Sequence, residues 1–258
     1  MSSAILQADG VSVRLGGVPI VTSASMALRA NELTVMVGPN GAGKTTLVRA
    51  LAGLLPAEGR ITLDGRALEQ LSPRERARRI AYLPQGNVFH WPLAVADVVA
   101  LGRYPHADPF SRVSVADRAA VARALAVTKT EIFASRPVTT LSGGERARVA
   151  LARVLATQAA VLLADEPIVS LDPRHQLVVM GLLREAARAG GAVLAVAHDL
   201  TLAARFADRV IVMDRGRIAA DAPPAEALSA DRIAAVFGVE VVPVDIGGAT
   251  VPVASRAI

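Results

Sequence analysis

Short apolar runs separated by polar breaks fill the first part of the chain, and this pattern predicts β-strands. Residues 4–37 are expected to form strands and hairpins that end in LTVMV (33–37), a continuous apolar run typical of a buried strand. The other predicted strands are RITLDGR (60–66), which runs into an Asp-Gly turn, IAYLP (80–84), VLLAD (161–165), AVLAVAH (192–198) and the hairpin RVIVMDRGRIAAD (209–221).

Helical patterns alternate with these strands. A helix is predicted over TTLVRALAGLL (45–55), stopped by Gly53 or Pro56, and a short one after the capping box that starts at Ser72. Further helices are predicted at about 144–157, from the Asp172-Pro173 cap to Gly190-Gly191, and near the C-terminus before small strands. Because strands and helices alternate, we expect an α/β fold with a parallel sheet covered by helices on both faces.

The segment from about residue 86 to 140 has a different character. Prolines at 92, 105, 109 and 137 interrupt it, and SVADRAAVARALAV (114–127) has a helical pattern. We interpret it as an inserted helical lobe within one domain that spans residues 1–258. Half of the residues are hydrophobic, which is enough for a sizeable core.

The composition narrows the class of protein. The chain has no cysteine, which excludes disulfides and thiolate metal sites and fits the cytosol. The N-terminus lacks a signal-peptide pattern, and charges interrupt every apolar run before 18 residues, so we expect no membrane span. The formal charge of +5 suits nucleotide phosphate, nucleic acid or an anionic membrane surface, and equally a solvated arginine-rich surface.

A glycine-rich turn, GPNGAGKT (38–45), matches the phosphate-binding pattern G-x-x-x-x-G-K-[ST] between a predicted strand and a predicted helix. Glycines let the chain wrap with its N–H groups inward, and the helix N-terminus adds positive partial charge. Lys44 is expected to reach the β- and γ-phosphates, and the Thr45 hydroxyl to ligate Mg²⁺. The predicted nucleotide-binding residues are Gly38, Pro39, Asn40, Gly41, Ala42, Gly43, Lys44, Thr45 and Thr46.

Two consecutive carboxylates follow the apolar run in VLLADEP (161–167), at the strand end where α/β ligand sites lie. Because successive strand side chains point opposite ways, we expect Asp165 to orient the Mg²⁺ shell and Glu166 to take a proton from the attacking water. An Asp-Glu pair at a strand end is also a helix-capping feature. The phosphate loop upstream favours the functional interpretation.

Three further polar residues are candidates with weaker signals. His198 ends its strand and would contact a γ-phosphate, although a lone histidine there is often a satisfied surface residue. Gln85 follows IAYLP at the start of the helical lobe, where it can sense Mg²⁺ or water. Asp172 opens a helix and serves as an N-cap whether or not it also acts across an interface.

The stretch LSGGERARVALAR (141–153) places two glycines in front of a basic amphipathic helix. Glycines leave the backbone N–H groups at the helix start uncovered, and the helix dipole makes that end positive. We therefore expect an anion to dock at residues 141–145.

Together these segments resemble the ATP-binding subunits of ABC transporters over nearly the whole chain. The resemblance rests, in chain order, on GPNGAGKTT (38–46), LPQ (83–85), LSGGE (141–145), VLLADEP (161–167), SLD (170–172) and AVAHD (195–199). LSGGE is the specific segment, because other phosphate-loop proteins lack it. The implied fold is a phosphate-loop NTPase (RecA-like) core with a parallel sheet, an N-terminal antiparallel β subdomain and an inserted α-helical subdomain.

The resemblance implies roles within one copy of the chain. Lys44, Thr45 and the loop backbone would bind ATP and its Mg²⁺, and Glu166 would be the catalytic base. Gln85 would link the metal site, which includes Asp165, to the helical lobe, and His198 would contact the γ-phosphate.

The resemblance also implies roles across two copies. Ser142, Gly143, Gly144 and Glu145 would bind ATP held by a second copy, and Asp172 would contact the opposite monomer. A symmetric homodimer with two sandwiched ATP molecules follows.

Two positions depart from the family pattern. The family usually stacks adenine on an aromatic side chain near the first strand, where VSVRLGG (11–17) has Leu15, so adenine binding is expected to be weaker. The position after DEP is usually threonine, and here it is Ile168.

The resemblance further implies separate membrane partners, as in an importer. ALGRYPH (100–106) resembles importers of iron–siderophore, haem and cobalamin, and DPRHQL (172–177) points the same way. The implied partners are two integral membrane permease subunits and, indirectly, a periplasmic or extracellular substrate-binding protein, with no nucleic acid, at the cytoplasmic face of the cell membrane. Phe89, His90 and Trp91 are expected either to line a groove for a membrane-subunit helix or to pack within the lobe.

Two other classes stay open at this point. A DNA-repair or chromosome-structure ATPase shares the LSGGE logic and suits the basic charge, but normally carries a long coiled-coil insertion. Only about fifty residues separate Gln85 from Leu141, without sustained heptads. A soluble phosphotransferase would use the phosphate loop but leaves LSGGE and His198 unexplained.

Overall fold

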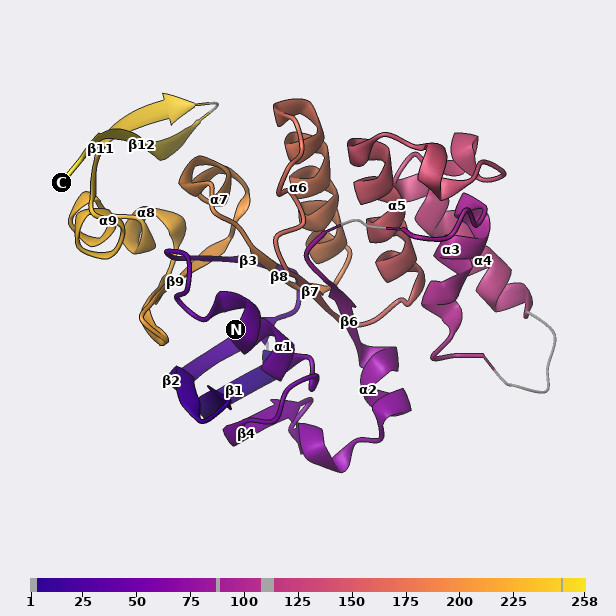
Figure 1. The fold of residues 1–258 in the computed structure, drawn as a ribbon, viewed down its shortest axis with the longest axis horizontal. Helices are drawn as coiled ribbons and strands as arrows, with labels where there is room; N and C mark the ends of the chain where they lie inside the picture. Colours follow the sequence, from indigo (N-terminus) through magenta and orange to yellow (C-terminus); the bar gives the residue numbers. More distant parts are fainter. Residues whose placement is uncertain (1–3, 87–88, 108–113, 247) are drawn as a thin grey trace.

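A six-stranded sheet lies at the centre of the computed structural model, which describes residues 4–86, 89–107, 114–246 and 248–258 (Figure 1). Its strand order is β10-β9-β3-β8-β7-β6. The parallel strands are β3 (Glu32–Val37), β6 (Ile80–Leu83), β7 (Val161–Ala164), β8 (Ala192–Val196) and β9 (Arg209–Asp214), and antiparallel β10 (Arg217–Ala222) closes one edge. The structure confirms the predicted parallel sheet and the predicted hairpin at residues 209–221.

A second, antiparallel sheet is built from the N-terminal part of the chain. Its order is β2-β1-β4-β5, from β1 (Ala4–Leu15), β2 (Val18–Arg29), β4 (Glu58–Leu63) and β5 (Arg66–Ala67). Gly16 and Gly17 join β1 to β2, and both have positive φ, as a tight hairpin turn requires. The predicted Asp-Gly turn at Asp64 and Gly65 joins β4 to β5 and also has positive φ at both positions.

Helices cover both faces of the central sheet, as the alternating pattern predicts. On one face lies α1 (Lys44–Leu51), whose buried residues pack in one core cluster with strands of the antiparallel sheet. The other face is covered by α5 (Gly143–Ala156), α6 (Pro173–Arg188) and α7 (Leu200–Phe206), which share a second cluster. The predicted helix over 45–55 ends earlier, at Leu51, because Gly53 adopts a left-handed φ of 68°.

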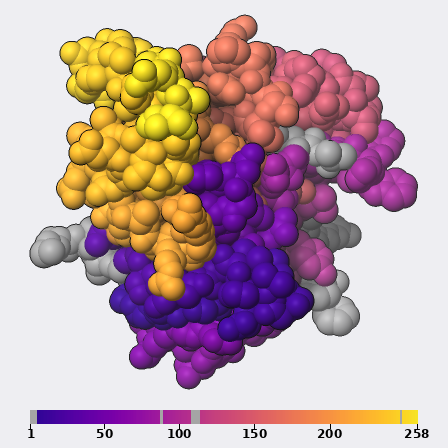
Figure 2. Space-filling view, turned by 60° about the vertical axis from the view of Figure 1, so that its left-hand side comes forward, coloured from indigo at the N-terminus to yellow at the C-terminus, as the bar shows by residue number. Residues whose placement is uncertain are grey.

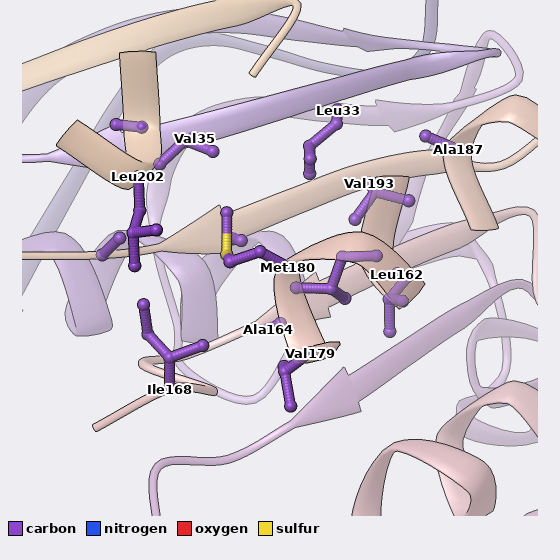
Figure 3. Packing of buried hydrophobic residues seen from close by; sticks show 14 of the residues in the cluster. Leu33, Val35, Leu162, Ala164, Ile168, Val179, Met180, Ala187, Val193 and Leu202 are labelled. Carbon is purple, nitrogen blue, oxygen red and sulfur yellow. The ribbon is translucent and has the colours of Figure 1, made fainter. Parts of the chain in front are cut away.

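The central strands are apolar throughout because both of their faces are buried. Along β3, Leu33 and Val35 belong to the cluster under α6, whereas Met36 belongs to the cluster around α1. Figure 3 shows Met180 of α6 among Leu33, Val35 and Val193, so this helix is anchored on β3 and β8. The sheet therefore holds its loop ends in fixed positions, and those ends carry the candidate site.

Within residues 95–107 and 114–140, short helices pack with α5 in a third apolar cluster. The α-helices are α3 (Val95–Ala100) and α4 (Val115–Val127), and α2 (Pro73–Arg79) precedes them with the predicted Ser72 capping box. Short 3₁₀ turns lie at Leu68–Gln70, Leu101–Arg103, Glu131–Phe133 and Val138–Thr140. Residues 87–88 and 108–113 of the predicted lobe lie outside the described residues.

The ALGRYPH segment (100–106) wraps around the C-terminal end of α5. Gly102 packs so closely that an added Cβ would overlap the Arg153 carbonyl. The buried Arg103 guanidinium donates from Nη1 to the carbonyls of Ala156 (2.7 Å) and Thr157 (3.2 Å), capping the helix. The segment thus has a structural task, which is to hold α5 against its neighbours.

The C-terminal part consists of α8 (Pro224–Ala227), α9 (Ala230–Phe237) and the hairpin of β11 (Val239–Ile246) and β12 (Ala249–Ala257). Figure 2 shows this part, in yellow and orange, above the indigo N-terminal sheet. Helix α7 was not predicted from the sequence, although Asp199 caps it by accepting from Leu202 N. Among the described residues, no helix is long and apolar enough to cross a membrane.

Candidate functional site

The phosphate loop (residues 38–45) connects β3 to α1 and is confined on both sides. An added Cβ at Gly38 would overlap the carbonyl of Met213 on β9. At Gly43, whose φ is 94°, an added Cβ would lie 2.9 Å from the carbonyl of Ile20 on β2. Both positions therefore require glycine, and the neighbouring strands fix the loop's shape.

The Lys44 side chain is folded onto its own loop. Its Nζ donates to the carbonyls of Gly38 (2.7 Å) and Pro39 (2.9 Å), and only 5% of the residue is exposed. Burial lowers the pKa of Lys44, and the nearby carboxylates Glu166 and Asp165 oppose that shift. The ammonium is held where a phosphate can replace the two carbonyls as its partner.

Asp165 lies directly beside the start of α1. Its carboxylate is fully buried, and the Thr45 hydroxyl donates to Oδ1 at 2.9 Å. The predicted pair of a hydroxyl and a carboxylate at the phosphate loop is therefore assembled. Hard oxygen ligands of this kind are those that Mg²⁺ prefers.

Tyr82 is a site residue that the sequence analysis missed. Its hydroxyl donates to Asp165 Oδ2 at 3.1 Å and accepts from Arg49 Nε at 3.4 Å. Burial raises the pKa of Tyr82, so the hydroxyl keeps its proton for this bond. The signal was present in IAYLP, because Tyr82 is the only polar side chain in an otherwise apolar strand beside β7.

Glu166 lies between Gln85 and His198, two candidate site residues that the sequence alone supports only weakly. Gln85 Nε2 lies 2.6 Å from Glu166 Oε2, and His198 Nε2 lies 2.8 Å from Oε1. Glu166 has a left-handed φ of 51°, an uncommon conformation for this residue type. The two acids thus have separate partners, as the sequence predicts, although both follow β7 rather than end it.

Residues 141–145, here called the signature segment, form the start of α5. Ser142 is the N-cap: its backbone N–H donates to Glu145 Oε2 (2.8 Å), and its Oγ accepts from Glu145 N (3.3 Å). Ser142 and Gly143 are exposed, whereas Gly144 is buried. Figure 1 shows α5 in the helical part of the molecule, away from α1 and the phosphate loop.

Asp172 is the N-cap of α6, as predicted. It accepts from His175 N at 3.0 Å, and its other oxygen lies 2.7 Å from His175 Nδ1. These bonds lower the pKa of Asp172 and keep it ionised. His175 is a second neighbour of the predicted site that the sequence analysis did not single out as a site residue.

The remaining sequence candidates fall in different environments. Leu15 lies at the end of β1 beside the exposed hairpin turn and is 43% exposed. Ile168 is buried in the cluster under α6, near Leu202 in Figure 3, which accounts for an apolar residue at this position. Phe89 packs against the core, whereas Trp91 is 75% exposed.

Comparisons with known proteins agree with this geometry. A family model described as ABC transporter matches residues 21–169, more than half of the chain. The hemin import ATP-binding protein HmuV of Streptomyces coelicolor is 49% identical over 253 residues, covering 97% of this chain and 90% of that protein. The protein of the same name from Rhodococcus jostii is 45% identical over 254 residues, covering 97% of this chain and 86% of that one.

A solved structure supports the fold independently. The chain matches an inward-facing ABC transporter described as of the metal-chelate type, with a TM-score of 0.85 over 98% of each chain. At 21% identity this likeness shows the fold alone, and it confirms the expected phosphate-loop NTPase architecture. With the family match and the HmuV relatives, the fold and the assembled site show that the chain belongs to the ABC transporter family, as an ATP-binding protein that hydrolyses ATP.

Proposed function

We propose that this protein powers the import of a metal-chelate substrate, with haem as the first candidate, through separate membrane subunits. The observation that carries the proposal is the 49% identity to a hemin import ATP-binding protein over 97% of the chain. Iron–siderophore and cobalamin are the other substrates to test, because ALGRYPH (100–106) resembles importers of all three.

In this proposal the phosphate loop holds ATP through its backbone N–H groups and through Lys44. A Mg²⁺ ion fits this site, because the Thr45 hydroxyl and the buried Asp165 carboxylate supply two hard oxygen atoms that already lie together. Gln85 completes the proposed set of metal-site residues. The ion would neutralise charge that develops on the phosphate oxygens.

Glu166 is the proposed catalytic base. Its carboxylate would accept a proton from the water that attacks the γ-phosphate, and before nucleotide binds Gln85 and His198 hold its two oxygens in place. His198 would shift from Glu166 to the γ-phosphate when nucleotide binds. Its 41% exposed side chain leaves that path open.

The proposed active assembly is a homodimer with two ATP molecules at its interface. The exposed N-terminus of α5 presents Ser142 and Gly143 to an outside anion, with Glu145 holding Ser142 in place through the capping box, and phosphate held by a second copy has the right charge. Buried Gly144 completes that helix start, and Asp172 would contact the opposite monomer. In this proposal the whole chain is one nucleotide-binding domain, with residues 86–140 as its inserted helical lobe.

Two permease subunits are the proposed membrane partners, and a substrate-binding protein would act through them. Trp91 and Tyr104, which are 75% and 80% exposed, are aromatic side chains of the helical lobe against which a membrane-subunit helix would pack. The protein would then lie peripherally at the cytoplasmic face of the membrane.

A pull-down from detergent-solubilised native membranes tests the proposal. Tagged Glu166→Gln protein with Mg-ATP is the bait, a Lys44→Ala bait is the control, and bound proteins are identified by mass spectrometry. A polytopic membrane partner is expected, and haem, siderophore and cobalamin binding to that complex then identifies the substrate. Recovery of soluble proteins or nucleic acid alone, with salt-sensitive DNA binding, would overturn the import assignment and favour a DNA-processing ATPase.

A further inference from the structure

His175 lies between two parts of the proposed dimer interface that are far apart in the sequence. Its ring packs on Gly144 of the signature segment, so closely that an added Cβ there would overlap ring atoms Cγ, Cδ2 and Nε2. The other ring nitrogen, Nδ1, lies 2.7 Å from Asp172. One side chain therefore touches the start of α5 and the N-cap of α6.

The bond to Asp172 fixes how the ring is oriented. Because Asp172 is ionised, it accepts, and Nδ1 carries the proton that His175 donates. The Asp172 carboxylate also accepts a hydrogen bond from the backbone N–H of His175 at 3.0 Å, which ties it to the first turn of α6. The ring is thus fixed against both helices, with 25% of its side chain exposed.

The groups on either side of His175 face outward. The Asp172 side chain is 59% exposed, and Ser142 and Gly143 are exposed at the start of α5. Ser142, Glu145 and His175 also line one cavity of about 600 Å³. Groups that contact a second copy of the chain must be exposed in the monomer, as these are. Whether they contact that copy at the same time depends on how they are positioned relative to each other.

We propose that His175 is a positioning residue that locks the signature segment to Asp172, so that both engage the second copy as one rigid surface. The proposal rests on the ATP-sandwiched homodimer proposed above. In this arrangement Gly144 is glycine because the His175 ring occupies the space of its side chain. Losing the ring would leave the two helix starts free to move independently, which weakens dimer closure without touching the phosphate loop.

The test uses full-length protein with Glu166→Gln as the parent, so that ATP is bound and not consumed. Three variants divide the contact: His175→Ala removes it, His175→Phe keeps a ring against Gly144 without a donor, and His175→Asn keeps a donor at the position of Nδ1 without the ring. Dimerisation is followed by sedimentation against Mg-ATP concentration. ATP binding to the monomer is followed by calorimetry at protein concentrations below dimerisation.

We expect His175→Ala to weaken ATP-dependent dimerisation by about tenfold or more, with Phe and Asn intermediate and monomeric ATP affinity unchanged. The backbone N–H that caps α6 remains in every variant, so thermal unfolding should stay close to that of the parent. Parent-like dimerisation of His175→Ala, or an equal loss of monomeric ATP binding, would overturn the proposal. If the parent itself stays monomeric, the proposed sandwich is wrong, and the two failures are thereby separated.

Discussion

At the scale of single residues, Asp165 and Glu166 show how adjacent carboxylates acquire different surroundings. Asp165 is fully buried and bonded to Thr45 and Tyr82, so its oxygens cannot turn. Glu166 takes a left-handed φ and meets Gln85 and His198 instead. A buried, fixed acid suits metal binding, and an acid with movable neighbours suits proton transfer.

Tyr82→Phe should impair hydrolysis through Asp165. Without the Tyr82 hydroxyl, the buried Asp165 Oδ2 loses its hydrogen-bond donor. The carboxylate is then free to turn away from Thr45. We expect ATP turnover to fall about tenfold and half-maximal activity to need about tenfold more Mg²⁺. Steady-state ATPase assays across Mg²⁺ concentrations measure both, and Tyr104→Phe, at an 80% exposed tyrosine, is the matched control. An unchanged Mg²⁺ requirement would show that Tyr82 does not hold Asp165.

Glu166→Gln should bind ATP and hydrolyse it at least about a hundredfold more slowly, because an amide cannot take the proton from water. The amide that replaces the carboxylate has nearly the same shape and would keep contacts to both neighbours, so the fold should be unaffected. Calorimetry gives ATP binding and phosphate release gives turnover, with Glu131→Gln on an exposed 3₁₀ turn as the control. Turnover at the parent rate would remove Glu166 as the base.

At the scale of elements, the ALGRYPH segment connects helices that are distant in sequence. Arg103 caps α5 and also donates from Nε to Asp117 Oδ1 at 2.8 Å in the first turn of α4. The hydrogen bonds from Ser114 and then from Arg103 lower the pKa of Asp117 from 3.8 to about 2. A carboxylate with a lowered pKa in the folded protein stabilises the fold above its unfolded pKa, and this stabilisation is lost as the pH falls through the folded value.

Asp117→Asn should therefore destabilise the protein by about 1 kcal/mol at neutral pH, because the amide loses the charge but keeps an oxygen that can accept from Arg103 Nε. The difference in unfolding free energy between parent and variant should stay constant above about pH 5 and shrink as the pH falls from about 4 toward 2. Denaturant unfolding across this range measures it, with exposed Asp231→Asn in the first turn of α9 as the control. A difference that does not depend on pH would mean that the charge of Asp117 contributes nothing.

The limits of prediction from the sequence also appear at the element scale. Strands and capped helices were predicted because their signals are local: the Ser72 capping box and the Asp64-Gly65 turn each lie within a few residues. Helix α7 was missed because it is short and its cap, Asp199, also fits the family motif AVAHD. The contacts of Tyr82 with Asp165 and of His175 with Gly144 join distant segments, so no local pattern predicts them.

At the scale of the whole molecule, the signature segment and the phosphate loop of one chain lie in different parts of the fold (Figure 1). Ser142 and Gly143 are exposed at one helix start, while Lys44 is buried at another. In the proposed homodimer, a complete ATP site is therefore built from two copies. A two-fold dimer would form two such sites, each with the phosphate loop of one copy and the signature segment of the other.

This arrangement predicts complementation between two inactive chains. Lys44→Ala disables the phosphate loop, and Gly143→Asp puts a carboxylate where phosphate would dock, at a position where an added side chain meets nothing within 4 Å. Each variant alone should be inactive.

In an equal mixture, half of the dimers carry both variants, and each of these has one site with an intact loop and an intact signature segment. Activity should therefore recover to about a quarter of the parent's when the two sites act independently. ATPase assays of the mixture against each pure variant measure the recovery. If each ATP site were instead completed within a single chain, the mixture would recover no activity. Every chain in it would then have either a defective phosphate loop or a defective signature segment in its own site.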